Sequence, residues 1–179
     1  TFRMIAASMR TSVPHAPDLL VGHSLGGFTA RMISAELEPR RIVYVDPAFR
    51  IGRPDGTEHD RFGDYMSITE ASVRAQHPRW TDTDVHIELM ARSTFDPEFM
   101  TIWPDGVNTT YPSTPVAPSL VLLASDGSVV SPEEADALRA EGNEVRVVDG
   151  TGHNLHRDDP AAVNAAVLEW AGIRVPVAA

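Results

Sequence analysis

Short apolar runs alternate along the chain with stretches in which apolar side chains recur every three or four positions. Four of these runs predict buried β-strands: 18–21, 42–45, 120–123 and 145–148. Helical spacing begins at four places: residues 2, 25, 132 and 160. The start at residue 132 is preceded by Ser131, which is predicted to form a capping box with Glu134. This alternation predicts an α/β fold in which helices flank a parallel sheet.

The pattern changes between residues 51 and 112, where charged and aromatic residues are mixed and the predicted helices are short. Thr81 and Asp84 form a helix-capping pattern, and Asp96-Pro97 resembles a second helix start. We therefore predict a core made of residues 1–50 and 113–179, interrupted once by a helical insertion at 51–112.

Composition narrows the possible chemistry. The 179 residues carry a net charge of −10, which argues against nucleic acid or an anionic membrane surface as the main partner. Cysteine and lysine are both absent, which excludes a thiolate nucleophile and a Schiff-base lysine in this chain. No apolar run approaches the length of a membrane span. We expect no cofactor, and a cytoplasmic rather than a secreted location.

Residues 22–26, Gly-His-Ser-Leu-Gly, fit the pattern G-x-S-x-G between a predicted strand and a predicted helix. This is the setting of a nucleophile elbow, in which a strained turn lifts the serine hydroxyl clear of the backbone. We expect the flanking glycines to be required because side chains there would clash. Ser24 would be the nucleophile, and the Leu25 backbone N–H would be one oxyanion donor.

A serine nucleophile needs a base, and seven histidines are available. His153 follows the last predicted strand, where parallel sheets hold their active sites, and is the favoured base. His156 is the alternative, although a loop hydrogen-bonding role suits it better. A metal site made of these two histidines is disfavoured because no third ligand is apparent.

The residue that orients the histidine should be a carboxylate at a strand end. Asp126 follows the third predicted strand and gives the chain order Ser, Asp, His, so it is favoured. Asp46, at the end of the second predicted strand, is the alternative acid. Asp158 and Asp159 are interpreted most simply as helix caps.

Together the Gly22–Gly27 turn, the loop at 124–130 and Gly152-His153 resemble the α/β-hydrolase superfamily. The resemblance implies that residues 51–112 are a cap. Five aromatic residues would then be candidate walls of an apolar pocket, or would simply pack the core of the cap itself: Phe62, Tyr65, Trp80, Phe95 and Trp103.

The chain departs from the family pattern at its N-terminal side, because only one predicted helix precedes the predicted strand 18–21 that leads into the nucleophile elbow. The resemblance implies four earlier strands, and a loop that usually supplies a second oxyanion N–H. With the start at Thr1, this leads us to expect the C-terminal part of a longer protein. The N-terminal fragment would be associated, present as a second chain, or lost.

The residues predict a serine hydrolase with a triad of Ser24, His153 and Asp126, acting on a small-molecule ester, thioester or lactone. The alternative is a non-hydrolytic member of the same superfamily: an acyltransferase, a biosynthetic cyclase or a ligand receptor.

Overall fold

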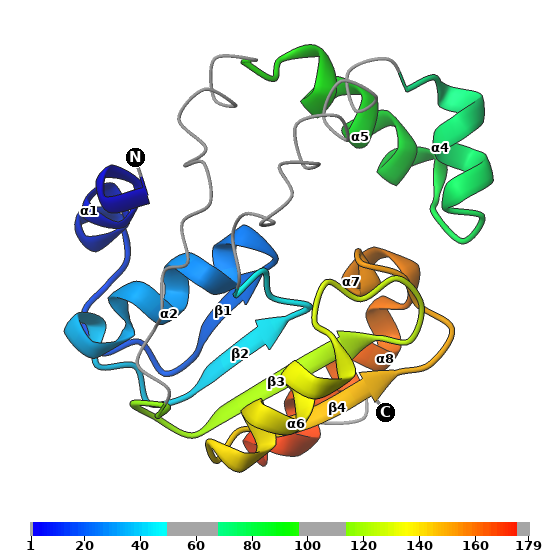
Figure 1. The fold of residues 1–179 in the computed structure, drawn as a ribbon. Coiled ribbons are helices and arrows are strands. Elements are labelled where there is room, and N and C mark those ends of the chain that lie inside the picture. Colours follow the sequence, from blue (N-terminus) through cyan, green and yellow to red (C-terminus); the bar gives the residue numbers. More distant parts are fainter. Residues whose placement is uncertain (1, 50–67, 97–113, 175–179) are drawn as a thin grey trace. The chain divides into compact units, whose positions relative to one another are not determined.

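The computed structural model of the chain describes residues 2–49, 68–96 and 114–174 (Figure 1). Its contacts divide the chain into two compact units. The larger unit is formed by Phe2–Phe49 and Thr110–Ala179, and the smaller one by Arg50–Thr109 together with Thr1. We describe each unit by itself.

A parallel four-stranded sheet forms the centre of the larger unit, with the strand order β1-β2-β3-β4. The strands are β1 (Leu20–His23), β2 (Ile42–Val45), β3 (Ser119–Ala124) and β4 (Glu144–Val148). This confirms the predicted α/β class and parallel sheet. β1 lies two residues later than the predicted 18–21, so it ends at His23, the residue before Ser24.

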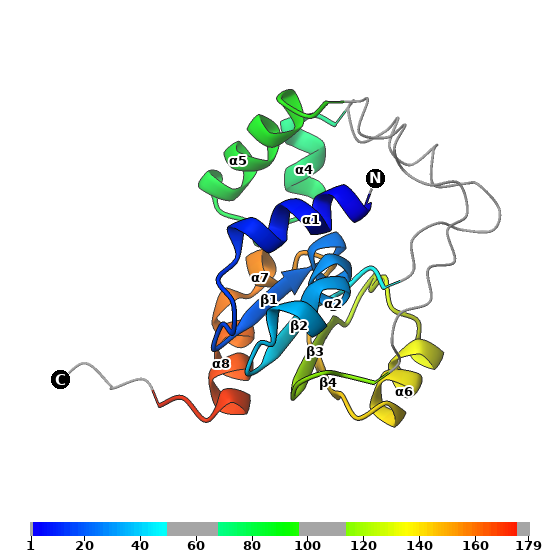
Figure 2. The same cartoon turned by 90° about the vertical axis from the view of Figure 1, so that its left-hand side faces the viewer.

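Helices cover both faces of this sheet (Figures 1 and 2). On one face α2 (Leu25–Leu37) and α6 (Pro132–Ala140) pack against one set of alternating strand residues. On the other face α7 (Leu155–Asp158) and α8 (Pro160–Ala171) pack against the other set. α1 (Phe2–Ser12) contacts α2. β2 and β3 are buried on both faces, and apart from the first residue of β3, Ser119, their sequences form the apolar runs expected of such strands.

Helix starts in this unit follow the predicted capping chemistry. Ser131 and Glu134 form a reciprocal capping box before α6, with Pro132 in the first turn. The Asp159 carboxylate accepts a hydrogen bond from the Ala162 N–H at the start of α8. α7, a single short turn after β4, was not predicted. No helix in the described part of the chain has the length and apolarity needed to cross a membrane.

The described part of the smaller unit is a pair of helices, α4 (Glu70–Gln76) and α5 (Asp82–Ser93). Thr81 and Asp84 form the predicted capping box. Trp80 is buried with Val73 and Val85, so it packs the core of this unit rather than standing free as a pocket wall. Phe95 follows α5 and is half-buried. The remaining predicted wall residues, Phe62, Tyr65 and Trp103, lie outside the described residues, and so does Pro97 of the predicted helix start at Asp96-Pro97.

Candidate active site

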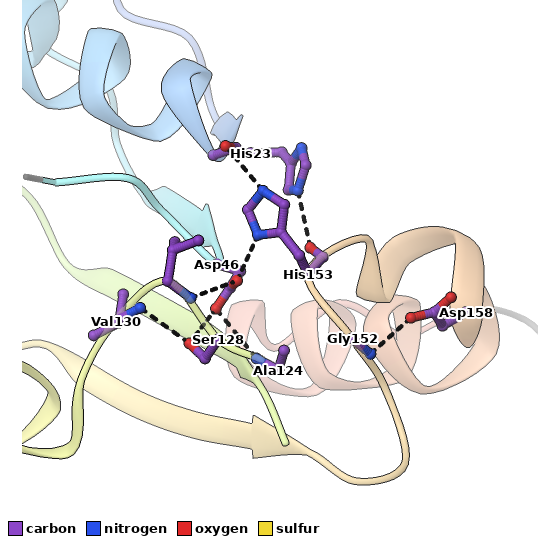
Figure 3. A network of polar contacts seen from close by, with 10 residues as sticks. His23, Asp46, Ala124, Ser128, Val130, Gly152, His153 and Asp158 are labelled. Atoms are coloured by element: carbon purple, nitrogen blue, oxygen red, sulfur yellow. Dashed lines mark hydrogen bonds and ion pairs between the residues drawn. The ribbon is translucent and has the colours of Figure 1, made fainter. Parts of the chain in front are cut away.

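Three side chains capable of hydrolytic chemistry meet at the carboxyl end of the sheet. Figure 3 shows two of them, His153 and Asp46, side by side. Ser24 directly follows β1, Asp46 directly follows β2, and His153 lies in the loop after β4. The strands are parallel, so their following loops all emerge at the same edge. Residues 24, 46 and 153 are therefore brought together although 129 positions separate the first from the last.

The turn at Ser24 has a strained backbone. Ser24 has φ 50° and ψ −119°, a conformation that side-chain-bearing residues rarely adopt. Hydrogen bonds hold it on both sides: its N–H donates to the Val45 carbonyl at 3.1 Å, and its carbonyl accepts from the Ala48 N–H at 3.0 Å. Neighbouring β2 and the loop that follows it thus fix the turn that presents the Ser24 hydroxyl.

The glycines around Ser24 are not equivalent. A Cβ atom on Gly22 would lie 2.5 Å from the Gly26 carbonyl oxygen, and one on Gly27 would lie 2.7 Å from the Pro47 Cβ. A Cβ on Gly26 would meet nothing within 4 Å. The expected clash is therefore confirmed at Gly22 and is wrong at Gly26. The close approach on the helix side falls instead on Gly27, where α2 passes over the turn after β2.

His153 lies between the other two side chains. Its Nε2 is 3.0 Å from the Ser24 Oγ, and its Nδ1 is 2.6 Å from the Asp46 Oδ2. A carboxylate can only accept, so Nδ1 carries the proton and Nε2 is left as the acceptor for the Ser24 hydroxyl. This is the tautomer that a general base for Ser24 requires.

Asp46 is fully buried, with 0% of its side chain exposed. Besides His153, its carboxylate accepts hydrogen bonds from the Ser128 hydroxyl and from the backbone N–H groups of Ala124 and Val129. Burial alone would raise the pKa of Asp46, but the hydrogen bonds from His153, Ser128 and Val129 outweigh it and hold the pKa below its ordinary value. The carboxylate is therefore ionised at neutral pH.

Asp46, and not the favoured Asp126, is the carboxylate that lies beside His153. Asp126 lies past the end of β3, is exposed, and uses its backbone N–H to bond the Thr151 carbonyl. Asp46, the alternative, occupies the position beside the ring of His153. Chain order could not separate the two, because both lie between Ser24 and His153. What separates them is local geometry: Asp46 directly follows β2 and its buried carboxylate contacts the His153 ring, whereas the Asp126 side chain is exposed.

The loop that carries His153 is held by side chains that the sequence did not single out for this purpose. The Asp158 carboxylate accepts from the Gly152 N–H at 2.7 Å, so Asp158 ties the loop instead of capping a helix. The His23 Nε2 is 3.0 Å from the His153 carbonyl oxygen. The ring of His156 packs edge-on against His23, with 4.6 Å between ring centroids. His153, and not His156, contacts the Ser24 hydroxyl.

Leu25 is the first residue of α2 and immediately follows Ser24. Backbone N–H groups in the first turn of a helix have no partner within the helix, and the helix dipole favours negative charge there. The Leu25 N–H is thus suitably placed to stabilise an anion formed beside Ser24. In the described ranges, no group of three or more side chains suited to binding a metal ion was found.

The sequence matches the alpha/beta hydrolase family over residues 3–166, and the chain belongs to this family. An esterase from Exiguobacterium antarcticum is similar in structure, with a TM-score of 0.67 and 12% identity over 96% of this chain and 74% of the esterase. For a carboxylesterase from Bacillus subtilis the TM-score is 0.64 and the identity 18%, over 95% of this chain and 66% of that protein. A thioesterase domain from the curacin biosynthetic pathway has a TM-score of 0.61 and 17% identity, over 94% of this chain and 72% of that domain. No curated protein matches the sequence. The structural similarities establish the fold.

The unequal glycines lead to a stability prediction. Gly22→Ala should lower the free energy of unfolding by about 2–3 kcal/mol, because its Cβ would meet rigid backbone. Gly26→Ala is its control within the same motif, and should raise that free energy by about 0.5 kcal/mol, since alanine favours a helix and space is open. Urea denaturation measures both. A larger loss for Gly26→Ala than for Gly22→Ala would contradict this description of the turn.

A second prediction concerns pH and His23. Burial lowers the pKa of His23 to about 4 from its ordinary value of 6.5, and the neighbouring His153 and His156 add to the lowering. The unfolded chain therefore takes up a proton before the folded one, and stability falls as the pH drops from 6.5 toward 4. Between pH 7 and pH 5, the wild type should lose about 1 kcal/mol more unfolding free energy than His23→Gln, after screening of this half-buried ring is allowed for. Equal losses from pH 7 to pH 5 would show that His23 titrates normally.

Proposed function

We propose that this protein is a serine hydrolase that cleaves a small-molecule ester, thioester or lactone through an acyl-enzyme on Ser24. The observation that carries the proposal is the continuous hydrogen-bonded chain from the Ser24 hydroxyl through both nitrogens of His153 to the buried carboxylate of Asp46. These groups differ in role as well as in position: Ser24 is a neutral nucleophile, His153 is a base in the required tautomer, and Asp46 is an ionised acceptor.

The proposed reaction proceeds in two halves. The Ser24 Oγ attacks the substrate carbonyl while the His153 Nε2 takes the hydroxyl proton, and the Leu25 N–H stabilises the oxyanion. Asp46 stabilises the imidazolium that forms. His153 then returns the proton to the leaving alcohol or thiol, and the acyl group remains on Ser24. In the second half His153 removes a proton from water, and the water oxygen attacks the acyl carbonyl. His153 then returns that proton to the Ser24 Oγ as its bond to the acyl carbon breaks, which releases the acid and regenerates free Ser24.

The substrate class rests on chemistry and on the fold. The proteins that share the fold include two esterases and a thioesterase domain, whose names denote the hydrolysis of esters and thioesters. A serine nucleophile paired with a histidine base is the arrangement used for such acyl chemistry. We further propose that the segment 51–112 is a helical cap insertion in a core formed by residues 1–50 and 113–179. Its support is that Arg50–Thr109 forms a compact unit of its own.

The nucleophile is tested with a fluorophosphonate probe, which forms a covalent bond to an activated serine. We expect one label per chain in the full protein, located on Ser24 by peptide mass spectrometry and absent from Ser24→Ala. No labelling of the wild type would defeat the covalent mechanism. Labelling with no turnover of p-nitrophenyl butyrate or its thioester analogue would favour the acyltransferase or binding alternative.

The two carboxylates provide a matched pair for the orienting acid. Asp46→Asn should lower kcat for ester hydrolysis about 10³- to 10⁴-fold, because the amide no longer holds the imidazole in its productive tautomer. Asp126→Asn, at an exposed position, should change kcat by less than about twofold. Steady-state kinetics with p-nitrophenyl butyrate measures both variants. A greater loss in Asp126→Asn would return the acid to the position first predicted from chain order.

A further inference from the structure

We infer that His23 is a positioning residue: its imidazole N–H fixes the main chain of His153 while the adjacent Ser24 binds the ring of His153. The inference rests on the proposed function, since it assigns a role in orienting the base of that reaction. Neither the family pattern nor the chain order assigns any role to the residue between Gly22 and Ser24.

The contact has a defined direction. The His23 Nε2 lies 3.0 Å from the carbonyl oxygen of His153, and a carbonyl can only accept a hydrogen bond. The Nε2 of His23 is therefore protonated and donates. The two rings lie 4.7 Å apart at an angle of 39°, so His23 also packs against the imidazole it helps to place (Figure 3).

His153 is thus held at both ends by one dipeptide. Ser24 contacts its Nε2, and His23 contacts its carbonyl. Because His23 and Ser24 are consecutive at the end of β1, the turn that sets the hydroxyl also sets the donor to the base. The peptide on the other side of His153 is tied separately, through the Gly152 N–H and the Asp158 carboxylate. Without the His23 contact, the carbonyl side of His153 would lose its side-chain anchor.

The surroundings of His23 keep this donor neutral. The ionisable groups around it are His153 on the loop, His156 on α7 and Asp46 after β2. A charged His23 would stand beside the imidazolium that forms on His153 during the reaction and would oppose it. Burial among these rings lowers the pKa of His23, so the ring donates its hydrogen bond without adding charge.

The test compares three variants of the full protein. His23→Phe keeps a ring and removes the donor, and His23→Gln restores an N–H donor on a flexible side chain. His15→Phe is the matched control, since the side chain of His15 is 67% exposed. With p-nitrophenyl butyrate, His23→Phe should lower kcat about 10- to 100-fold with KM nearly unchanged, as expected for a misplaced base. His23→Gln should recover part of this loss, and His15→Phe should match the wild type.

A second readout does not depend on activity. Hydrogen exchange of the peptide spanning residues 150–156, followed by mass spectrometry, should become several-fold faster in His23→Phe and stay at the wild-type rate in His15→Phe. Exchange in β3, followed in the same experiment, should not change, which separates a local loss from global unfolding.

The outcomes separate the two proposals. A wild type that neither hydrolyses the ester nor reacts with the fluorophosphonate probe defeats the proposed function, while the exchange data still decide the His23 contact. Wild-type kcat in His23→Phe of an active enzyme overturns the positioning role. Unchanged hydrogen exchange at residues 150–156 in His23→Phe also overturns the positioning role. A loss of kcat in this variant that equals the loss of folded protein overturns it as well.

Discussion

The hydrogen bond between His153 and the buried carboxylate of Asp46 is the constraint on which the rest of the site depends. An ionised carboxylate without exposed surface is strongly unfavourable unless donors surround it. Here the donors come from three places: the end of β3, the loop after it, and the loop after β4. Those loops must converge on Asp46 for the charge to be tolerated, and their convergence brings His153 to Ser24. The satisfaction of one buried charge thus assembles the candidate site.

The sheet supplies the geometry that makes this convergence possible. Parallel strands in the order β1-β2-β3-β4 send all their following loops to one edge, and β2 lies beside β1. Ser24 and Asp46 each adopt positive φ directly after their strands, so both turns are sharp and both side chains stay near the sheet edge. The buried strands β2 and β3, which pack between the covering helices, keep these two strained turns in place. The buried centre of the sheet therefore supports a site made of strained turns.

Much of this was predictable from the residues. The apolar runs of β2 and β3 and the capping boxes at Thr81 and Ser131 are local signals, and the structure has these elements where they were expected. Ser24 and His153 were predictable because their glycine-rich surroundings follow strands. The choice of Asp46 over Asp126 and the roles of His23 and Ser128 all depend on contacts between residues more than 80 positions apart. Such long-range contacts leave no local pattern in the chain.

In the proposed mechanism Asp46, and not Asp126, holds the proton on the His153 Nδ1. Proton NMR of the native protein tests it, because a histidine N–H bonded to a buried carboxylate resonates far downfield of the amide region. We predict one such resonance in the wild type, its loss in Asp46→Asn, and its persistence in Asp126→Asn. Persistence of the signal in Asp46→Asn, or its loss in Asp126→Asn, would contradict the arrangement described for this site.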